Sequence, residues 1–312
     1  MQVPRRDLGR TFGGAIVVAA VSAAAPVIAQ AAKPPLTVAF AGSMGVLMNE
    51  GFGPEFKRET GAAFHGIGEG AFALAQQIAA GTMLPDVFIS ITPGPINVVK
   101  KAEKITSAVP IASTAMVIAY SPRSRFAKQL GAAANRRIPW WEVLQARGLR
   151  FGRTDPRTDP QGQNIIFTFK LAERFYNQPH LLQNVLGPVI NPRQIFTEPS
   201  LLARLDTGEL DATSGYESAA KSLKLPFITL PDEINLSNPA LAESWYETVS
   251  LTLNAKGRKT LVRPQPLVFY AAILKEAPNA ELARRFVTLL TTTKGAAILA
   301  KYGYNPPMGV PI

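Results

Sequence analysis

The chain has 312 residues, 47% of them hydrophobic, and a formal net charge of +11. It contains no cysteine, which excludes disulfides, thiol chemistry and thiolate metal sites. Its two histidines, His65 and His180, offer little basis for a histidine metal site or a Ser–His–Asp triad. Basic residues occur as short pairs such as Lys100-Lys101, so the charge predicts a solvated basic surface rather than nucleic-acid binding.

Residues 1–31 are typical of a cleaved export signal. Arg5, Arg6 and Arg10 precede an apolar run that ends with small residues around the expected cleavage site. The adjacent arginines favour the twin-arginine route, but Gly9 stands where an apolar residue is usual, so Sec export stays open. Removal of this segment leaves 30 basic and 21 acidic residues, a net charge of +9. We expect a periplasmic mature protein.

Short apolar runs alternate with helical patterns along the mature chain, which predicts an α/β fold with mostly parallel sheets. Strands are expected at 36–40, 85–91, 114–122, 248–254 and 266–274. Helices are expected at 71–81, 93–101, 138–144, 164–176, 279–292 and 294–303. The helical pattern that follows the first strand contains Gly51, Gly53 and Pro54, which should kink or restart it.

Small-residue turns precede several of the helical patterns. They occur at Gly42-Ser43, at Glu69-Gly70-Ala71 and at Gln161-Gly162. A helix start presents unpaired backbone N–H groups and the positive end of a dipole, so each turn is either a plain connection or part of an anion cradle. If the three turns meet in space at the carboxyl ends of strands, they would suit a compact oxyanion.

Five segments together resemble a known family. They are AFAGSMG (39–45), GEGAFALAQQIAAGTMLPDVFIS (68–90), TDPQGQNIIFTFKLAERFY (158–176), GYESAA with LPDEINL (215–220 and 230–236), and AELARRFVTLL with GAAILAKYGYNP (280–290 and 295–306). In this order the segments resemble the periplasmic molybdate/tungstate-binding proteins of ABC importers, which are type II solute-binding proteins. The resemblance extends over nearly the whole mature chain.

The resemblance implies a fold and a set of ligand residues. The fold is two α/β lobes joined by two crossover segments, here residues 33–114 plus 266–312 for lobe one and 115–265 for lobe two. The ligand positions of the family correspond to Gly42 and Ser43, Gly70 and Ala71, Gln161 and Gly162, Glu198, and Tyr216. Two positions depart from the family: Ala71 stands in place of a serine, and Gly215 in place of a glutamate of the archaeal-type branch.

The implied function is capture of a tetrahedral oxyanion, molybdate or tungstate, for delivery to an ABC permease. No cofactor, no enzymatic activity and a monomeric state are expected. Sulfate, phosphate or a small carboxylate as ligand, and a sensory role, stay open, because the two departures would change the donor set. In the archaeal-type branch two carboxylates can expand the coordination of the metal, and the resemblance matches Asp159 to one of them. The interpretation of Asp159 as a turn residue is preferred, since its charge would repel a dianion. An exported hydrolase is disfavoured because no nucleophile, base and orienting acid can be assigned.

Trp140-Trp141 is interpreted as a packing cluster, with partner docking as the alternative.

Overall fold

The computed structural model describes residues 35–255 and 258–312. They belong to a compact unit that spans Lys33–Ile312. The predicted export signal, residues 1–31, lies outside the described residues. None of the described helices has the length and apolar character that a membrane span requires.

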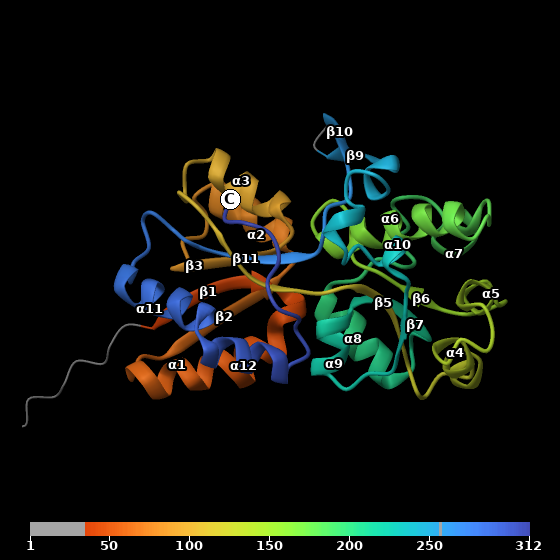
Figure 1. Ribbon diagram of the computed structural model, residues 1–312, viewed down its shortest axis with the longest axis horizontal. Helices are drawn as coiled ribbons and strands as arrows, with labels where there is room; N and C mark the ends of the chain where they lie inside the picture. The colour runs from red at the N-terminus through yellow and green to blue at the C-terminus, as the bar shows by residue number, and fades with distance from the viewer. Residues whose placement is uncertain (1–34, 256–257) are drawn as a thin grey trace, which may run out of the picture. The chain divides into compact units, whose positions relative to one another are not determined.

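The first sheet has five strands in the order β2-β1-β3-β11-β4. Its strands are β1 (Leu36–Ala41), β2 (Phe64–Glu69), β3 (Val87–Ile91), β4 (Val109–Ser113) and β11 (Val268–Ile273). Strand β1 runs parallel to β2 and β3, whereas β11 runs antiparallel to β3 and β4. Helices α2 (Ala71–Ala79) and α3 (Pro93–Lys101) cover one face. Helices α1 (Gly53–Thr60), α11 (Ala280–Thr291) and α12 (Thr293–Lys301) cover the other (Figure 1).

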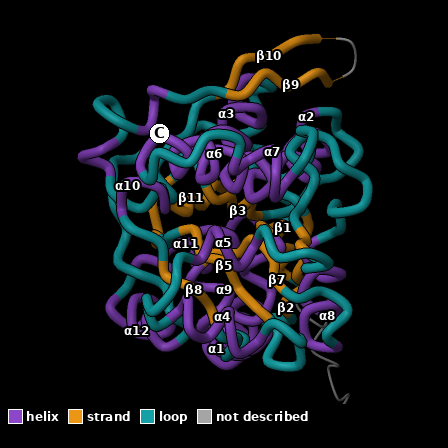
Figure 2. The backbone as a smooth tube through the Cα atoms, turned by 90° about the vertical axis from the view of Figure 1, so that its right-hand side faces the viewer, coloured by secondary structure: helices purple, strands orange, loops and turns teal. Residues whose placement is uncertain are grey.

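The second sheet has four strands in the order β6-β7-β5-β8. They are β5 (Met116–Tyr120), β6 (Phe151–Gly152), β7 (Ala212–Tyr216) and β8 (Phe227–Thr229). The surrounding helices are α4 (Ala127–Ala134), α5 (Trp140–Leu144), α6 (Pro160–Phe175), α7 (Leu181–Leu186), α8 (Glu198–Thr207), α9 (Glu217–Ser222) and α10 (Asp232–Asn235). Strands β9 (Leu251–Ala255) and β10 (Arg258–Val262) pair only with each other and project away from the helices (Figures 1 and 2).

The predicted two-lobed α/β class is confirmed, but the expected predominance of parallel pairing is wrong. Strand β5 is antiparallel to both of its neighbours, and so is β11. Before each of these strands the chain crosses from one sheet to the other. Each strand therefore enters its sheet at the opposite end from a strand that follows a βα unit, and it runs in the opposite direction. The predicted lobe boundaries, 114–115 and 265–266, fall between strands of different sheets and stay a prediction.

The predicted interruption after the first strand is present. A short 3-10 helix, Gly42–Met44, is followed by a π-helical turn, Leu47–Phe52, before α1 begins. At Gly53 a Cβ atom would lie 2.8 Å from the carbonyl oxygen of Met48, so only glycine permits this backbone approach. The rings of Phe52 and Phe56 then pack edge-on against Phe286 of α11, with centroids 6.1 and 5.3 Å apart. These contacts hold the π-helical turn and α1 against α11.

Candidate functional site

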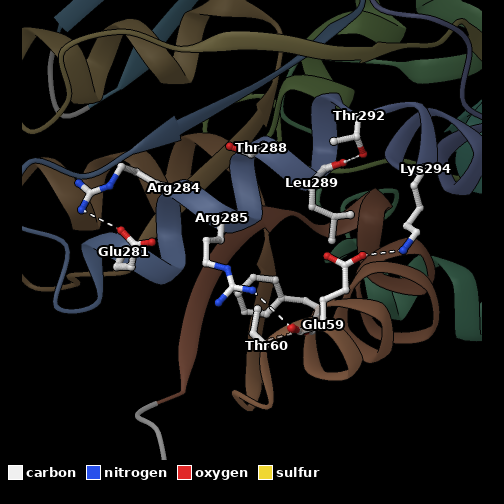
Figure 3. A pocket seen from close by; sticks show the side chains of 10 residues that line it. Glu59, Thr60, Glu281, Arg284, Arg285, Thr288, Leu289, Thr292 and Lys294 are labelled. Atoms are coloured by element: carbon white, nitrogen blue, oxygen red, sulfur yellow. Dashed lines mark hydrogen bonds and ion pairs between the residues drawn. The ribbon is translucent and has the colours of Figure 1, made fainter.

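Besides a cavity of about 430 Å³ beside Trp140-Trp141, two larger cavities lie in the described part of the chain, and they differ in what lines them. One, of about 530 Å³, lies among α1, α11 and α12 (Figure 3). Its cations are already engaged: Arg284 pairs with Glu281 at 3.3 Å, and Lys294 with Glu59 at 2.6 Å. It contains none of the predicted ligand residues. The other, of about 690 Å³, is lined by Gly70 and Glu198 among others, and is the candidate site.

The turn after β1 places Ser43 beside a buried carboxyl group. The backbone of Ser43 lies beside the carboxyl group of Glu198 and acts to lower its pKa, against the larger effect of burial. The Ser43 Oγ is buried and has no hydrogen-bond partner among the described residues. At Gly42 a Cβ atom would lie 2.9 Å from Glu198 Oε2, so glycine is what allows this carboxyl to approach the turn. Ser43 thus offers an unused hydroxyl donor beside this carboxyl group.

The start of α2 lies against the loop that precedes α6. The N–H of Ala73 donates to the carbonyl oxygen of Thr158 at 3.0 Å. At Gly70, which is the N-cap of α2, a Cβ atom would lie 2.8 Å from that same oxygen and 3.4 Å from Asp159 Oδ2. Ala71 is buried in the first turn of this helix. The second predicted turn therefore lies beside Asp159, but it supplies no side-chain hydroxyl.

Helix α6 begins at Pro160 because Asp159 caps it. Asp159 Oδ1 accepts from the N–H of Gln161 at 2.8 Å, and proline favours the first helical position. Gly162 faces the loop 154–156, where a Cβ atom would lie 2.7 Å from the nitrogen of Pro156. Gly162 is thus explained by close backbone packing. The helix starts four residues before the predicted 164, since this cap motif was interpreted as a loop.

The side chain of Gln161 connects the lobe-two part of the site. Its Nε2 donates to Glu198 Oε1 at 3.1 Å, and its Oε1 accepts from Ser214 Oγ at 2.9 Å. One helical turn later, Asn164 Nδ2 donates to the hydroxyl of Tyr216 at 3.1 Å. Tyr216, at the end of β7, is only 1% exposed, so its hydroxyl belongs to the buried polar cluster.

Glu198 is the first residue of α8, and its carboxyl group points into the protein rather than to solvent. Burial, and then the nearby charge of Asp159, raise the pKa of Glu198 well above its ordinary value. Burial likewise raises the pKa of Asp159 to about 6. Burial together with the charge of Asp159 raises the pKa of Tyr216. No lysine or arginine is found among the described residues that line the cavity.

Of the predicted residues, Gly70 and Glu198 line the large cavity, and Gln161, Glu198 and Tyr216 line a small adjoining space of about 10 Å³. The turn at Gly42-Ser43 lies against Glu198, whereas Ala71 and Gly162 line neither space. The set of ligand residues stays a prediction.

Residues that sequence reasoning did not select are Asn164 and Ser214. It named Glu198 as a ligand position and Asp159 as a turn residue, but it did not predict that both carboxyl groups would be buried in the site. Asn164 and Ser214 lie in apolar segments and give no separate signal.

The remaining sequence candidates lie elsewhere. His65 is in β2 and His180 precedes α7, and the described residues hold no group of three or more side chains suited to a metal ion. Trp140 packs edge-on against Phe169, with ring centroids 5.6 Å apart. Trp141 stacks on Tyr176 at 3.9 Å. These contacts support the interpretation of Trp140-Trp141 as a packing cluster.

Comparisons with known proteins agree with this architecture. The molybdate/tungstate-binding protein WtpA of Pyrococcus abyssi is 30% identical over 207 residues, which are 60% of this chain and 58% of that relative. The chain thus spans less than two thirds of that relative's length. The fold matches the Azotobacter vinelandii periplasmic molybdate-binding protein with a TM-score of 0.64 and 16% identity, covering 88% of this chain and 100% of that one.

The same fold occurs in the sulfate-binding protein SubI of Mycobacterium tuberculosis, with a TM-score of 0.56, 14% identity, and coverage of 88% of this chain and 87% of that one. The fold alone therefore does not select the anion. The model of the bacterial extracellular solute-binding protein family matches residues 36–305. Because this match extends from β1 to beyond α12, the chain belongs to the bacterial extracellular solute-binding protein family.

Proposed function

We propose that this chain captures a tetrahedral oxyanion of the molybdate and tungstate class between its two lobes and delivers it to an ABC permease. The proposal includes export to the periplasm, cleavage of residues 1–31 and a monomeric state. The observation that carries it is the meeting of the turn at Gly42-Ser43 with the starts of α2, α6 and α8 at one buried polar cluster. The similarity to the molybdate/tungstate-binding protein WtpA of Pyrococcus abyssi supports the class of anion.

The donors available to such an anion are neutral. Ser43 Oγ has no partner in the part of the chain that the structure describes, and the Gln161 side-chain amide now donates to Glu198. A hydrogen bond to a charged group contributes about 1.5–3 kcal/mol. Several such bonds, less the costs of ordering and desolvation, are consistent with micromolar binding, which corresponds to about 8 kcal/mol. A site built from dipoles rather than paired cations also permits release when the lobes separate.

Because residue 71 is alanine, the start of α2 offers the anion no side-chain hydroxyl group. A serine at the start of α2 would add one hydroxyl donor, and its absence should lower affinity by roughly ten- to a hundredfold. Backbone N–H groups in the first turn of α2 would remain available to the anion. We therefore expect binding that depends strongly on the one remaining serine hydroxyl, that of Ser43.

Thermal denaturation with a panel of anions tests the proposal. Molybdate and tungstate at about a thousandfold excess over Kd should raise Tm on the order of 10 °C, while sulfate and phosphate should raise it less. Ser43→Ala should weaken molybdate binding by roughly ten- to a hundredfold, because it removes one charge-assisted hydrogen bond. Ser107→Ala, at an exposed serine, is the matched control and should leave binding unchanged. A wild-type Tm that responds to neither metal oxyanion would refute the proposal.

A further inference from the structure

Two buried carboxyl groups lie where the proposed anion would bind. Asp159 is 7% exposed and Glu198 is 6% exposed. Both accept hydrogen bonds from the same residue: Asp159 from the backbone N–H of Gln161 at 2.8 Å, and Glu198 from its side-chain amide at 3.1 Å. A site for a dianion thus already contains two acids, and a charged acid beside a dianion opposes binding.

The groups that face this pair do not neutralise it. Tyr216 at the end of β7 and Tyr304 after α12 are buried and un-ionised, and the pKa of each is raised, mainly by burial. Asp155, in the loop before α6, adds a further negative charge, but Arg157 pairs with it at 2.5 Å. Glu69 at the end of β2 also lines the cavity. Within the described residues no cation lines this cavity, so the pair must be neutralised by protons or not at all.

Of the two acids, Glu198 is the one suited to carry the proton. Asp159 caps α6, and the N–H of Gln161 and the positive end of the helix both favour its charged form. Glu198 also lies in the first turn of a helix, α8, but burial and then the charge of Asp159 raise the pKa of Glu198 well above its ordinary value, and it lines both the open cavity and the small space beside Tyr216. Its Oε2 also lies at the Gly42-Ser43 turn, where an oxyanion would be held.

We propose that Glu198 determines both the specificity and the pH dependence of this site, because its carboxyl group must be protonated for an oxyanion to bind. This inference rests on the proposed function. The proton comes from solvent and forms an O–H bond on Glu198, which removes the charge that opposes a dianion and gives the carboxyl group one donor toward the ligand, while its other oxygen can still accept from Gln161.

The raised pKa values of Glu198 and Asp159 agree with this assignment, since both acids hold a proton at higher pH than they would in solvent. If binding requires one proton, affinity falls tenfold for each pH unit above the point at which that proton is lost. Molybdate and sulfate stay dianions between pH 6 and pH 9, so over this range the dependence reports on the protein.

The test is the molybdate affinity of the full mature chain at pH 6, 7, 8 and 9, by titration calorimetry, for wild type and Glu198→Gln. Wild-type Kd should rise at least tenfold between pH 6 and pH 9. Glu198→Gln, which mimics the neutral acid, should bind at pH 9 about as tightly as wild type does at pH 6. Equal wild-type affinity at pH 6 and pH 9 would overturn the inference and leave the proposed function standing.

A second measurement does not depend on the folding of the variant. The wild type is titrated with molybdate at pH 8 by calorimetry, in two buffers that differ in ionisation enthalpy. The difference in heat gives the number of protons that the protein takes up or releases when the anion binds. Uptake of a fraction of a proton or more per bound anion supports the inference, and zero uptake together with unchanged affinity overturns it. If molybdate, tungstate, sulfate and phosphate all fail to bind at every pH, the proposed function fails and this inference with it.

Discussion

Replacement of Asp159 by asparagine should stabilise the protein at neutral pH and not at acidic pH. Burial raises the pKa of this carboxyl from 3.8 to about 6. The folded protein therefore binds a proton more readily than the unfolded chain between those pH values, so the free energy of unfolding falls as pH rises through this window and is level above it. A shift of about two units corresponds to about 3 kcal/mol at neutral pH.

Asparagine removes the charge and keeps an oxygen that can cap α6, so Asp159→Asn should gain up to about 3 kcal/mol at pH 8 and close to nothing at pH 4. Urea denaturation at pH 4, 6 and 8 measures this difference. Asp155→Asn is the matched control. Burial acts to raise the pKa of Asp155, but the bonds from Arg157 outweigh it and lower that pKa, so this variant should lose stability at neutral pH. An Asp159→Asn variant that is less stable than wild type at pH 8, or a difference that does not change with pH, would refute the reasoning.

Two further substitutions test contacts that position the site and hold lobe two together. Gly42→Ala places a Cβ atom 2.9 Å from Glu198 Oε2 and should displace that side chain, lowering molybdate affinity at least tenfold by calorimetry. Gly45→Ala, whose Cβ atom meets nothing within 4 Å, should have no such effect, and an equal loss in both would contradict the steric argument. Asp211 has a fully buried carboxylate that accepts hydrogen bonds from Arg150 at 3.0 Å and from Ser124 at 2.7 Å. Asp211→Asn weakens these bonds and should lower the free energy of unfolding by about 2–3 kcal/mol, as measured by urea denaturation. Glu209→Gln, in an exposed pair with Arg204, should change stability by less than about 1 kcal/mol, and a larger change there would count against the role given to burial.

Local signals in the sequence were sufficient for most of the elements near the site. The apolar run 36–40 and the small residues after it predicted β1 and the turn at Ser43. The start of the helix at 93–101 was predicted correctly, because proline marks it. Such features depend only on neighbours in the chain, so a sequence without an alignment is enough to find them.

The direction of β5 and β11 could not be predicted in the same way. Both are short apolar strands, and the residues within 116–120 and 268–273 do not indicate with which neighbouring strand each will pair. Their antiparallel pairing follows from where the chain crosses between sheets, which is a property of the whole fold. The predicted single strand at 248–254 was likewise one half of the hairpin formed by β9 and β10.

The inward orientation of Glu198 is the part of the site that sequence reasoning missed. A glutamate in the first turn of a helix ordinarily faces solvent, where it favours the helix dipole. Here the absence of a Cβ at Gly42 and the amide of Gln161 together leave a place for its carboxyl group. These partners are 156 and 37 residues away in the sequence, so only the folded arrangement reveals the contact.

The position of β11 has a consequence for synthesis of the chain on the ribosome. Strand β4 pairs with no strand of its sheet except β11, in the part of the chain that the structure describes, and β11 is made more than 150 residues later. The first sheet therefore stays incomplete until residues 268–273 emerge, whereas all four strands of the second sheet are available by residue 229. Nascent chains that stop before residue 268 would expose the edges of β3 and β4, so the sheet that is begun first is completed only by a strand near the end of the sequence.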